Sequence, residues 1–499
     1  MTTGGKSNLL LLLLCTFLFP GFEVDALSYD YSASIECLEN PHKPQYGGGI
    51  IVNPELNHGL GGWSTFGDAK LQHRESQAGN KFAVARNRNQ PHAESNCWSM
   101  MKGGLTVNAS GPAELYFESK NTSVEIWVDS VSLQPFTEKE WKSHHDQSIE
   151  KNRKSNVRIQ AVDAEGNPLR NATISIQQKA PSFPFGCAMN KNILANTAYQ
   201  NWFTSRFGVT TFENEMKWYS TENSQGKEDY SVADAMLQFA KQHNIAVRGH
   251  NVFWDDPQYQ LGWVTSLDNI NWLWLLSRAI LYNWATKADG ETTLFMNEFN
   301  TIEESEDGDS TPAKYLQKLR DIQAFPGNNN LKMAIGLESH FRSPNIPYIR
   351  SSIDTLAAAN LPIWITELDV QSGPNQAGYL EQIMREVYTH PKIQGIIIWA
   401  AWRREGCYRM CLTDNNFKNL PTGDVVDKLL SEWGLKAGFA SSATTDTNGV
   451  FETSLPHGDY EVQITDLEFV KVSNAMVQGL NVAASSSASQ QPLLVQLAA

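Results

Sequence analysis

Between residues 183 and 402 the chain alternates short apolar runs with longer amphipathic stretches. The apolar runs are rich in β-branched and aromatic residues, which favours buried strands. The stretches between them, such as Val232 to His243 and Ala377 to His390, have helical spacing. Alternating strands and helices are typical of parallel βα units, so we predict an α/β fold, a (β/α)₈ TIM-type barrel that lacks one βα unit. The seven predicted strands lie at 183–190, 208–215, 246–254, 293–300, 332–341, 362–370 and 395–402.

The predicted strand at 362–370 ends on carboxylates. Leu361-Pro362-Ile363-Trp364 leads into Ile365-Thr366-Glu367-Leu368-Asp369-Val370. A carboxylate at the end of a buried strand is costly unless it is paired or used, and barrel chemistry sits at the carboxyl ends of the strands. Glu367 is therefore a candidate catalytic residue, and the structural alternative is an acid that caps the following helix.

In the segments on either side of the predicted barrel, apolar and polar residues alternate with the two-residue period of β-strands, and turn residues separate the runs. We therefore expect all-β sandwich modules to flank the barrel, and within the first of them strands at Ala113 to Glu118 and Val124 to Leu133. The predicted parts are a β-sandwich at 48–136, a charged helical linker at 137–156, a β-hairpin at 157–180, the barrel at 181–436 and a C-terminal β segment at 437–499.

The β segments that flank the barrel are too small to be stable alone, since an isolated hairpin is marginal in water. The first turns at Asp163 to Pro168, and the second contains Pro456-His457-Gly458-Asp459. Joined end to end, they resemble the small carboxypeptidase-regulatory-like β-sandwich. We predict that 157–177 and 450–465 pair in space, with the barrel inserted between them. The alternative is two unrelated surface hairpins.

The N-terminus has the pattern of a secretory signal peptide. Lys6 precedes an apolar run from Leu9 to Pro20, and a plausible cleavage point follows Ala26. The run is too short to span a membrane. We expect residues 1–26 to be removed and the mature protein to be secreted and extracellular.

Export makes disulfide bonds possible. Cys15 leaves with the signal peptide, and five cysteines remain, so at least one is free or pairs between chains. Cys407 and Cys411 are close enough in sequence to bridge a loop, and Cys37 with Cys97 is the other expected pair. No His/Cys spacing resembles a zinc site, so neither a metal ion nor a cofactor is expected. Three N-glycosylation acceptors fit the same compartment, at Asn108, Asn121 and Asn171.

The charge and the aromatic content narrow the range of partners. The chain carries a net charge of −14, which argues against nucleic acid because nucleic acid requires a basic footprint. It also contains 15 tryptophans, whose faces stack well on sugars. A neutral polysaccharide is therefore the expected class of partner, with no nucleic acid and no membrane.

Polar and aromatic residues recur at the ends of the predicted strands in a fixed order. Together these motifs resemble glycoside hydrolase family 10, most closely the plant endo-1,4-β-xylanases, over about residues 183–435. The motifs are Phe212-Glu213-Asn214-Glu215-Met216-Lys217-Trp218, Arg248-Gly249-His250-Asn251-Val252-Phe253-Trp254, Gly336-Leu337-Glu338-Ser339-His340, Thr366-Glu367-Leu368-Asp369 and Ile398-Trp399.

The resemblance implies retaining hydrolysis of xylan or a related β-1,4-linked plant cell-wall polysaccharide. In that reaction one carboxyl attacks the anomeric carbon, and a second protonates the leaving oxygen and later activates water. Glu367 matches the family's nucleophile, and His340 matches the histidine that orients it. The structural alternatives are core positions for the two platform tryptophans and a satisfied buried role for His250. The residues that match the substrate-binding wall and platform are Glu213, Asn214, Lys217, His250, Trp254 and Trp399.

The sequence departs from the family pattern at the proton donor. The family motif Trp-Asp-Val-Val-Asn-Glu is absent, and Leu294 to Asn300 resembles the family's fifth strand rather than its fourth. We therefore predict that the donor strand is missing, with 269–289 standing for the end of one unit and the start of the next and Glu298 as an accidental substitute. A second departure is Glu338, where the microbial pattern carries Gln. An extra carboxyl near Glu367 raises the proton affinity of one of the two.

The N-terminal β region carries a weaker resemblance. Asn53-Pro54-Glu55-Leu56, Gly61-Gly62-Trp63 and Trp127 to Leu133 resemble the start and the end of carbohydrate-binding module family 22. The middle is shorter than a full module of that family.

Three interpretations follow. The first is a secreted cell-wall xylanase whose activity is weakened or lost because the general acid is missing. The second is a non-catalytic xylan-binding wall protein that uses the same groove. The third is a structural wall glycoprotein. Release of reducing ends from xylan separates the first from the others, and xylan pull-down separates the second from the third.

Overall fold

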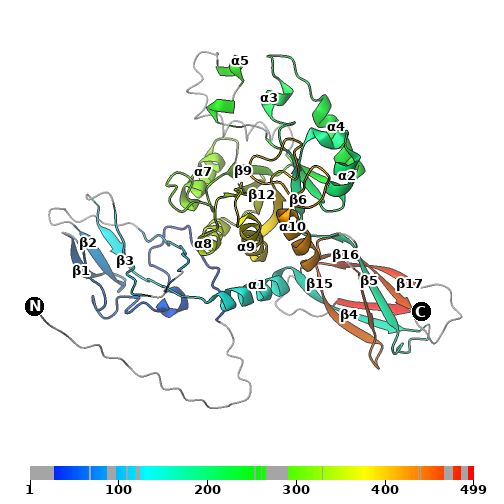
Figure 1. The fold of residues 1–499 in the computed structure, drawn as a ribbon. Helices are drawn as coiled ribbons and strands as arrows, with labels where there is room; N and C mark the ends of the chain where they lie inside the picture. The colour runs from blue at the N-terminus through cyan, green and yellow to red at the C-terminus, as the bar shows by residue number, and fades with distance from the viewer. Residues whose placement is uncertain are drawn as a thin grey trace, which may run out of the picture.

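The computed structural model describes residues 27–498 with internal gaps. The predicted signal peptide and the acceptors Asn108 and Asn121 lie outside the described residues. Figure 1 shows a small sheet near the N-terminus, a central α/β part and a β unit near the C-terminus, with helix α1 (Glu138–Asn152) between the first and the last. No described helix has the length and apolar character needed to cross a membrane. The gaps are 67–68, 87–96, 108, 110, 120–123, 164, 252–253, 255, 260, 266–289, 329, 437, 439, 466–475 and 485–492.

The central part is built on one parallel sheet, in the order β8-β7-β6-β13-β12-β10-β9, with the short β11 paired to β12. All seven predicted strands are confirmed, and the segment predicted as one strand at 332–341 contains both β10 and β11. The strands are β6 (Phe185–Met189), β7 (Val209–Phe212), β8 (Ala246–Arg248), β9 (Leu294–Glu298), β10 (Met333–Leu337), β11 (His340–Phe341), β12 (Ile363–Val370) and β13 (Ile393–Ile398).

Helices follow the strands of this sheet and bury apolar faces against it. Strands such as β13 are apolar on both faces because helices cover the outside and side chains fill the inside. The helices predicted at 232–243 and 377–390 are confirmed as α4 and α9. The helices are α2 (Thr197–Thr204), α3 (Trp218–Thr221), α4 (Ser231–Gln242), α5 (Gly262–Thr265), α7 (Pro312–Ala324), α8 (Ile346–Ala357), α9 (Gln376–Thr389) and α10 (Pro421–Glu432), with 3₁₀ turns η1 (Gln45–Gly48), η2 (Lys191–Leu194) and η3 (Pro257–Tyr259).

Among the described residues, β8 and β9 are the two edges of the sheet and do not pair with each other. A side chain links these edges, because Arg248 Nη2 of β8 donates to Asn297 Oδ1 of β9 at 3.1 Å. The Arg248 guanidinium also lies 5.0 Å from the ring centre of Phe295. The interval 269–289, where the sequence predicts the remnants of two units, lies outside the described residues. The missing donor strand therefore stays a prediction.

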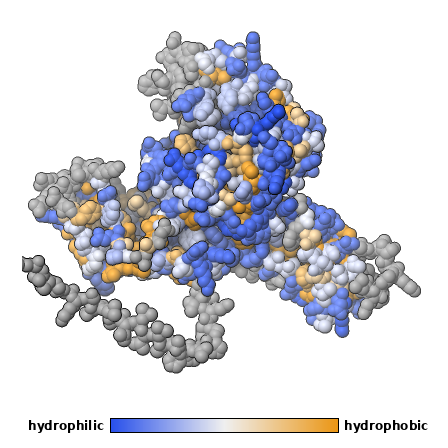
Figure 2. Space-filling model, in the orientation of Figure 1, coloured by the Kyte–Doolittle hydropathy of each residue, from blue (hydrophilic) through white to orange (hydrophobic). Residues whose placement is uncertain are grey.

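The N-terminal part contains a three-stranded antiparallel sheet, and the predicted two-layer sandwich is not seen in its described residues. The predicted Cys37–Cys97 disulfide is present. The strand predicted at 113–118 is wrong, because the described residues of this segment pair with none of β1, β2 and β3 and leave Leu115 and Tyr116 exposed. The strands are β1 (Lys70–Glu75), β2 (Lys81–Arg86) and β3 (Ile126–Val128). Figure 2 shows apolar side chains on the surface of this part, and the exposed ones include Ile50, Val52, Met101, Leu105 and Val107.

The predicted linker at 137–156 forms helix α1, which begins with a capping box between Thr137 and Glu140. The helix is not only a solvated spacer, because one face packs on α9. Trp141 Nε1 donates to Glu386 Oε2 at 2.9 Å, and His145 Nε2 lies 2.9 Å from the same oxygen. Burial disfavours the charge of Glu386, but Arg350, which donates to it, holds its pKa at about 2. Helix α1 is therefore fixed to the central part by two side chains that contact a buried, ionised carboxylate.

The β unit consists of two sheets, β14-β5-β16-β17 and β15-β4-β18, which share one apolar core. β15 pairs antiparallel with β4, and β16 pairs antiparallel with β5, so the predicted pairing of 157–177 with 450–465 is confirmed. The strands are β4 (Lys154–Val162), β5 (Thr173–Pro181), β14 (Ala440–Thr444), β15 (Val450–Pro456), β16 (Gly458–Thr465), β17 (Met476–Val482) and β18 (Leu493–Ala498).

The predicted β-hairpin at 157–180 is wrong. Both strands exist, but β4 and β5 belong to different sheets. The chain crosses between the sheets after Val162, so that Ile159 of β4 and Ile174 of β5 are both fully buried in the common core. A hairpin would have left this apolar face open to water, and burial of that face from both sides is more favourable.

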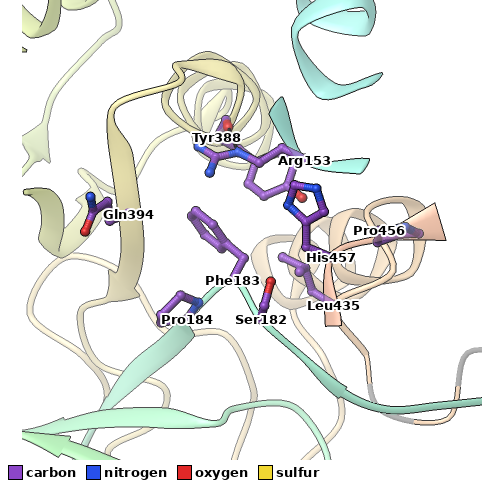
Figure 3. Close-up of a pocket in the computed structure, with 9 residues that line it drawn as sticks. All are labelled: Arg153, Ser182, Phe183, Pro184, Tyr388, Gln394, Leu435, Pro456 and His457. Carbon is purple, nitrogen blue, oxygen red and sulfur yellow. Dashed lines mark hydrogen bonds between the residues drawn. The ribbon is translucent and has the colours of Figure 1, made fainter. Parts of the chain in front are cut away.

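A pocket of about 180 Å³ lies where the β unit meets the central part (Figure 3). The Arg153 guanidinium donates to the carbonyls of Tyr388, His390 and Ile393 and lies 4.6 Å from the ring centre of Phe183. The backbone N–H of His457 donates to the Arg153 carbonyl. Because Arg153 is committed to these structural contacts, we assign the pocket to the junction of the two parts rather than to ligand binding.

We expect Ile174→Ala to destabilise the β unit by about 2–5 kcal/mol, because it opens a cavity in a fully buried core position. Urea unfolding followed by circular dichroism measures the change. Val477→Ala on β17 is the matched control, since Val477 is 51% exposed and its truncation should change stability by less than about 0.5 kcal/mol. Equal effects of the two substitutions would contradict the shared core.

Candidate active site

The side chain of Asn297, on β9, lies at the centre of a polar cluster at the carboxyl ends of the strands. Its Oδ1 accepts from Thr366 Oγ1 at 2.6 Å and from Arg248 Nη2 at 3.1 Å. Its Nδ2 donates to Glu367 Oε1 at 2.9 Å and to Glu338 Oε1 at 3.2 Å. Because two donors face the amide oxygen, the amide nitrogen must face the two carboxylates.

Irregular backbone at two strand ends makes this cluster possible. The pairing of β12 with β13 shifts register between Ile365 and Leu368, and both residues of the shifted stretch, Thr366 and Glu367, contact Asn297. On the neighbouring β10, a Cβ added at Gly336 would lie 2.5 Å from Asn297 Oδ1. Glycine is therefore required beside this amide.

The backbone conformation of Ser339, the residue before His340, places His340 at the cluster. Ser339 has a φ of 73°, an uncommon conformation for a residue other than glycine. The turn is held because the buried carboxylate of Glu303 accepts from the His340 backbone N–H at 3.0 Å. His340 Nε2 then lies 3.7 Å from Glu367 Oε2 and 3.6 Å from Glu338 Oε2.

The other ring nitrogen of His340 is also held. Nδ1 lies 3.1 Å from Asp369 Oδ1, and that oxygen accepts from Arg409 Nε at 2.6 Å. Arg409 lies in the loop closed by the predicted Cys407–Cys411 disulfide, which is present. The orientation of His340 therefore depends on a chain of contacts that ends in a cross-linked loop.

The two central carboxyls differ in their affinity for protons. Burial opposes the charge of Glu367, but the surrounding histidines and Arg248 lower its pKa to about 2. Burial and the neighbouring charge of Glu367 raise the pKa of Glu338 to about 8. At neutral pH the pair therefore holds one proton, on Glu338, and Glu367 is ionised. This separation is what a nucleophile beside a proton-bearing group requires.

The two histidines near Glu367 also differ. Burial lowers the pKa of His250 to about 4, although its Nε2 lies 3.7 Å from Glu367 Oε1. Burial acts in the same direction on His340, but contacts with Asp369 and Glu367 outweigh it and raise its pKa to about 10. His340 is therefore the cationic partner of Glu367 at neutral pH, and His250 is a neutral one.

Four of the predicted substrate-binding residues meet on one side of Glu367. Lys217 is buried, and its Nζ lies 4.5 Å from the ring centre of Trp254 and 5.6 Å from that of Trp399. His250 meets Trp399 edge to face, with ring centres 5.5 Å apart. Tyr259 stacks on Trp254 at 3.9 Å. The two tryptophans are half-buried, so they are not core residues.

Glu213 and Asn214 lie beside this wall. Asn214 Oδ1 accepts from Tyr219 at 2.8 Å and from Lys217 at 3.4 Å. Glu213 is fully buried, and its oxygens accept from Asn190 at 3.2 Å and from Arg403 Nε at 2.6 Å. The sequence predicts that Glu213 holds sugar hydroxyls. In the structure this side chain is fully buried and anchors Arg403.

Glu298 ends β9 beside Asn297. One oxygen of its carboxylate accepts from the neighbouring Phe299 N–H at 3.3 Å. Its charge raises the pKa of Glu338, as burial and the charge of Glu367 do more strongly, whereas His340 lowers that pKa. Glu298 is therefore near the cluster.

Three side chains of the cluster have the residue types of a metal site. One ligand atom from each of Glu338, His340 and Glu367 lies within 4.8 Å of the other two.

Sequence reasoning identified Glu367, His340, Lys217, His250, Trp254 and Trp399, and the structure brings all six together. It missed Asn297 as the residue that contacts both carboxyls, although Asn297 lies in a strand-end motif it had noted. It also missed Arg409 and Arg403, whose partners are 40 and 190 residues away. No local pattern indicates such pairs.

Comparison with known proteins identifies similar sequences. The family model described as Glycosyl hydrolase family 10 matches residues 175–280 and 277–421. Endo-1,4-beta-xylanase 5 from Arabidopsis thaliana is 37% identical over 530 residues, which take in 91% of this chain and 93% of the relative. Endo-1,4-beta-xylanase 5-like from the same plant is 40% identical and covers 75% of this chain and 73% of the relative.

Among solved structures, xylanase 10B from Thermotoga petrophila RKU-1 in complex with xylobiose is similar at 18% identity. The similarity covers 50% of this chain and 94% of that chain, with a TM-score of 0.43.

We expect the His340 ring to stay protonated up to about pH 10 and the His250 ring to stay neutral down to about pH 4. NMR of the protein labelled in its histidine rings, with His340→Gln and His250→Gln to assign the signals, measures both. A raised histidine pKa stabilises the fold fully below pH 6.5, and this contribution is lost as pH rises toward 10. The stability difference between wild type and His340→Gln should therefore shrink over that range. Titration of His340 near pH 6.5 would contradict the network.

Proposed function

Because the chain belongs to glycosyl hydrolase family 10, we propose that it acts on xylan as a retaining β-1,4-glycosidase with Glu367 as nucleophile. The observation that carries the proposal is the state of Glu367. It is ionised, only 5% exposed, and oriented by Asn297 and His340 at the end of a parallel strand. A positioned carboxylate of this kind can attack an anomeric carbon and leave again.

The half-buried wall beside Glu367 supports a sugar substrate. Trp254 and Trp399 are half-buried aromatic residues, and Lys217, which lies near both rings, contacts Asn214. The relatives' names identify endo-1,4-β-xylanases, so xylan is the proposed substrate.

We further propose that turnover of xylan is reduced because the family's proton-donor strand is absent. The alignment with the Arabidopsis relative runs over 530 residues, more than the 499 of this chain, so the relative carries positions that this chain lacks. The family match is split into two segments that meet at 277–280, in the interval between β8 and β9. These observations support a deletion at the place where the sequence predicts it.

Loss of a general acid has a known scale. A positioned general acid raises the reaction rate by about 10²–10⁴-fold, because a sugar oxygen is a poor leaving group without a proton. The wall does not depend on the missing strand. A non-catalytic xylan-binding protein is therefore the second candidate function, favoured by the intact contacts around Trp254 and Trp399.

Secretion to the cell wall is part of the proposal. The N-terminal pattern of residues 1–26 supports it, and so do the two disulfides, since disulfides persist in oxidising compartments. Cys187 is the remaining cysteine, and it is buried and unpaired. Asn171, at a turn before β5, is an expected glycosylation acceptor among the described residues.

We expect a 2-fluoro-xylobioside with an activated aryl leaving group to label Glu367 covalently, because such a substrate requires little acid assistance. Mass spectrometry of proteolytic peptides locates the label. Glu367→Gln is the control and should take up no label while it still binds xylan. A label on another carboxyl, or no label on the folded wild-type protein, would contradict the assignment of Glu367 as the nucleophile.

We compare the ratio of two rates, turnover of an activated aryl xylobioside divided by turnover of xylan, between this protein and a family member with the complete motif. We expect the ratio to be about 10²–10⁴ times larger in this protein, because only xylan requires a general acid. Release of aryl alcohol and of reducing ends measures the two rates. Rates on xylan equal to those of the complete relative would show that the site has a fully effective acid.

A further inference from the structure

We propose that Glu338 is the general acid and base of this site, in place of the carboxyl that is absent with the donor strand. The inference rests on the proposed function, and it goes beyond it by naming the proton donor. It depends on which carboxyls of the site are still available, on their distance from Glu367 and on how the site holds its protons.

Four other carboxyls lie near the site, and each has partners of its own. Asp369 accepts from Arg409 and faces His340, and Glu213 accepts from Arg403 and Asn190. Glu303 is buried and accepts backbone N–H groups of Ile302 and His340. Glu298 accepts from the backbone N–H of Phe299.

Glu338 has a different environment. Its side chain is 23% exposed, so a sugar in the site can reach it. Its contacts within the cluster are the Asn297 amide at 3.2 Å and the His340 ring at 3.6 Å. Neither of these contacts is with an arginine guanidinium. Both Asn297 and His340 also contact Glu367, so the two carboxyls lie in the same cluster.

The separation from Glu367 fits the reaction. A carboxylate oxygen of Glu338 and one of Glu367 lie within 4.8 Å of each other, and Asn297 Nδ2 donates to both residues. In retaining glycosidases the two carboxyl groups lie about 5–5.5 Å apart, which leaves no room for water between nucleophile and sugar. The two carboxyls are thus too close for the inverting route, which requires about 6.5–9.5 Å, and closer to the spacing of the retaining route.

The charges that face Glu338 determine which carboxyl keeps the proton. Glu367 faces it from β12, Glu298 from β9 and Glu303 from the turn after β9, and all three are acidic. His340 on β11 is the cation beside it, and Lys217 interacts with both Glu338 and Glu367. Glu367 has the larger share of cations and hydrogen-bond donors, so it ionises first and Glu338 remains the acid.

The proposed steps balance. Glu367 attacks the anomeric carbon while the bond from that carbon to the leaving oxygen breaks, and the Glu338 proton moves to that oxygen. Water then attacks the anomeric carbon of the glycosyl–Glu367 ester. The proton of the water passes to the Glu338 carboxylate, and Glu367 leaves as a carboxylate. The enzyme returns to its starting state with one water consumed.

The position of Glu338 predicts a slow reaction. β10 and β12 are neighbouring strands, so Glu338 delivers its proton from the nucleophile's own side of the sugar. A donor so placed meets the leaving oxygen at a poor angle, which lowers the benefit of general acid catalysis. We therefore expect xylan turnover that is weak and that depends on Glu338.

Azide rescue tests the role directly. Glu338→Ala, assayed with an aryl xylobioside and sodium azide, should regain turnover and yield the β-xylobiosyl azide, because azide occupies the space of the lost base and attacks the glycosyl enzyme. Glu338→Gln should lose about 10²–10³-fold on xylan while the 2-fluoro label still forms on Glu367, which shows an intact fold and nucleophile. Glu298→Ala is the matched control and should show neither rescue nor the β-azide.

Three results would overturn the proposal. The first is that Glu338→Gln leaves xylan turnover unchanged. The second is that the Glu298 variant, and not the Glu338 variant, forms the β-azide. The third is that the wild-type protein is labelled at Glu367 but releases no reducing ends from xylan. Absence of the label from wild type would instead refute the proposed function itself, so the two failures are distinguishable.

Discussion

The site is organised by the amide of Asn297, which holds two acidic side chains close together. Carboxylates this near repel each other, and in a half-buried position the repulsion is little screened. Asn297 donates one hydrogen bond to each and is itself fixed by Thr366 and Arg248. The remaining repulsion is relieved when one carboxyl keeps a proton. The difference in pKa between Glu367 and Glu338 follows from this crowding together with the cationic His340.

The same amide links the carboxyl cluster to the two edges of the described sheet. Arg248 ends one edge, and Asn297 lies on the other. The described side chains that contact Glu367 are Asn297, His340 and His250. None of them lies in the interval 269–289, where the sequence predicts a deletion, so the surroundings of Glu367 do not depend on that interval.

Outside the site, buried polar contacts join the parts of the molecule. Trp141 and His145 of helix α1 contact Glu386 of α9, and Arg153 fixes the start of the β unit to α9 and the entry to β13. Glu386 also pairs with Arg350 of α8, and truncating either member of that pair would leave an uncompensated buried charge. The barrel can thus be inserted within the β unit without making either part loose.

Local sequence patterns determined much of this protein. The strands of the central sheet, helices α4 and α9 and the Cys407–Cys411 disulfide follow from periodicity or spacing within short segments. Glu367 is indicated by its place at a strand end, and His340 by the resemblance to the family. The pairing of 157–177 with 450–465 was predictable because neither segment can bury its apolar face alone. The tertiary structure decided what local patterns do not encode. It placed β4 and β5 in different sheets, buried Glu213 against Arg403, and put Asn297 between two carboxyls. Those outcomes depend on contacts between residues that are distant in the chain, and only the path of the folded backbone determines which distant side chains meet.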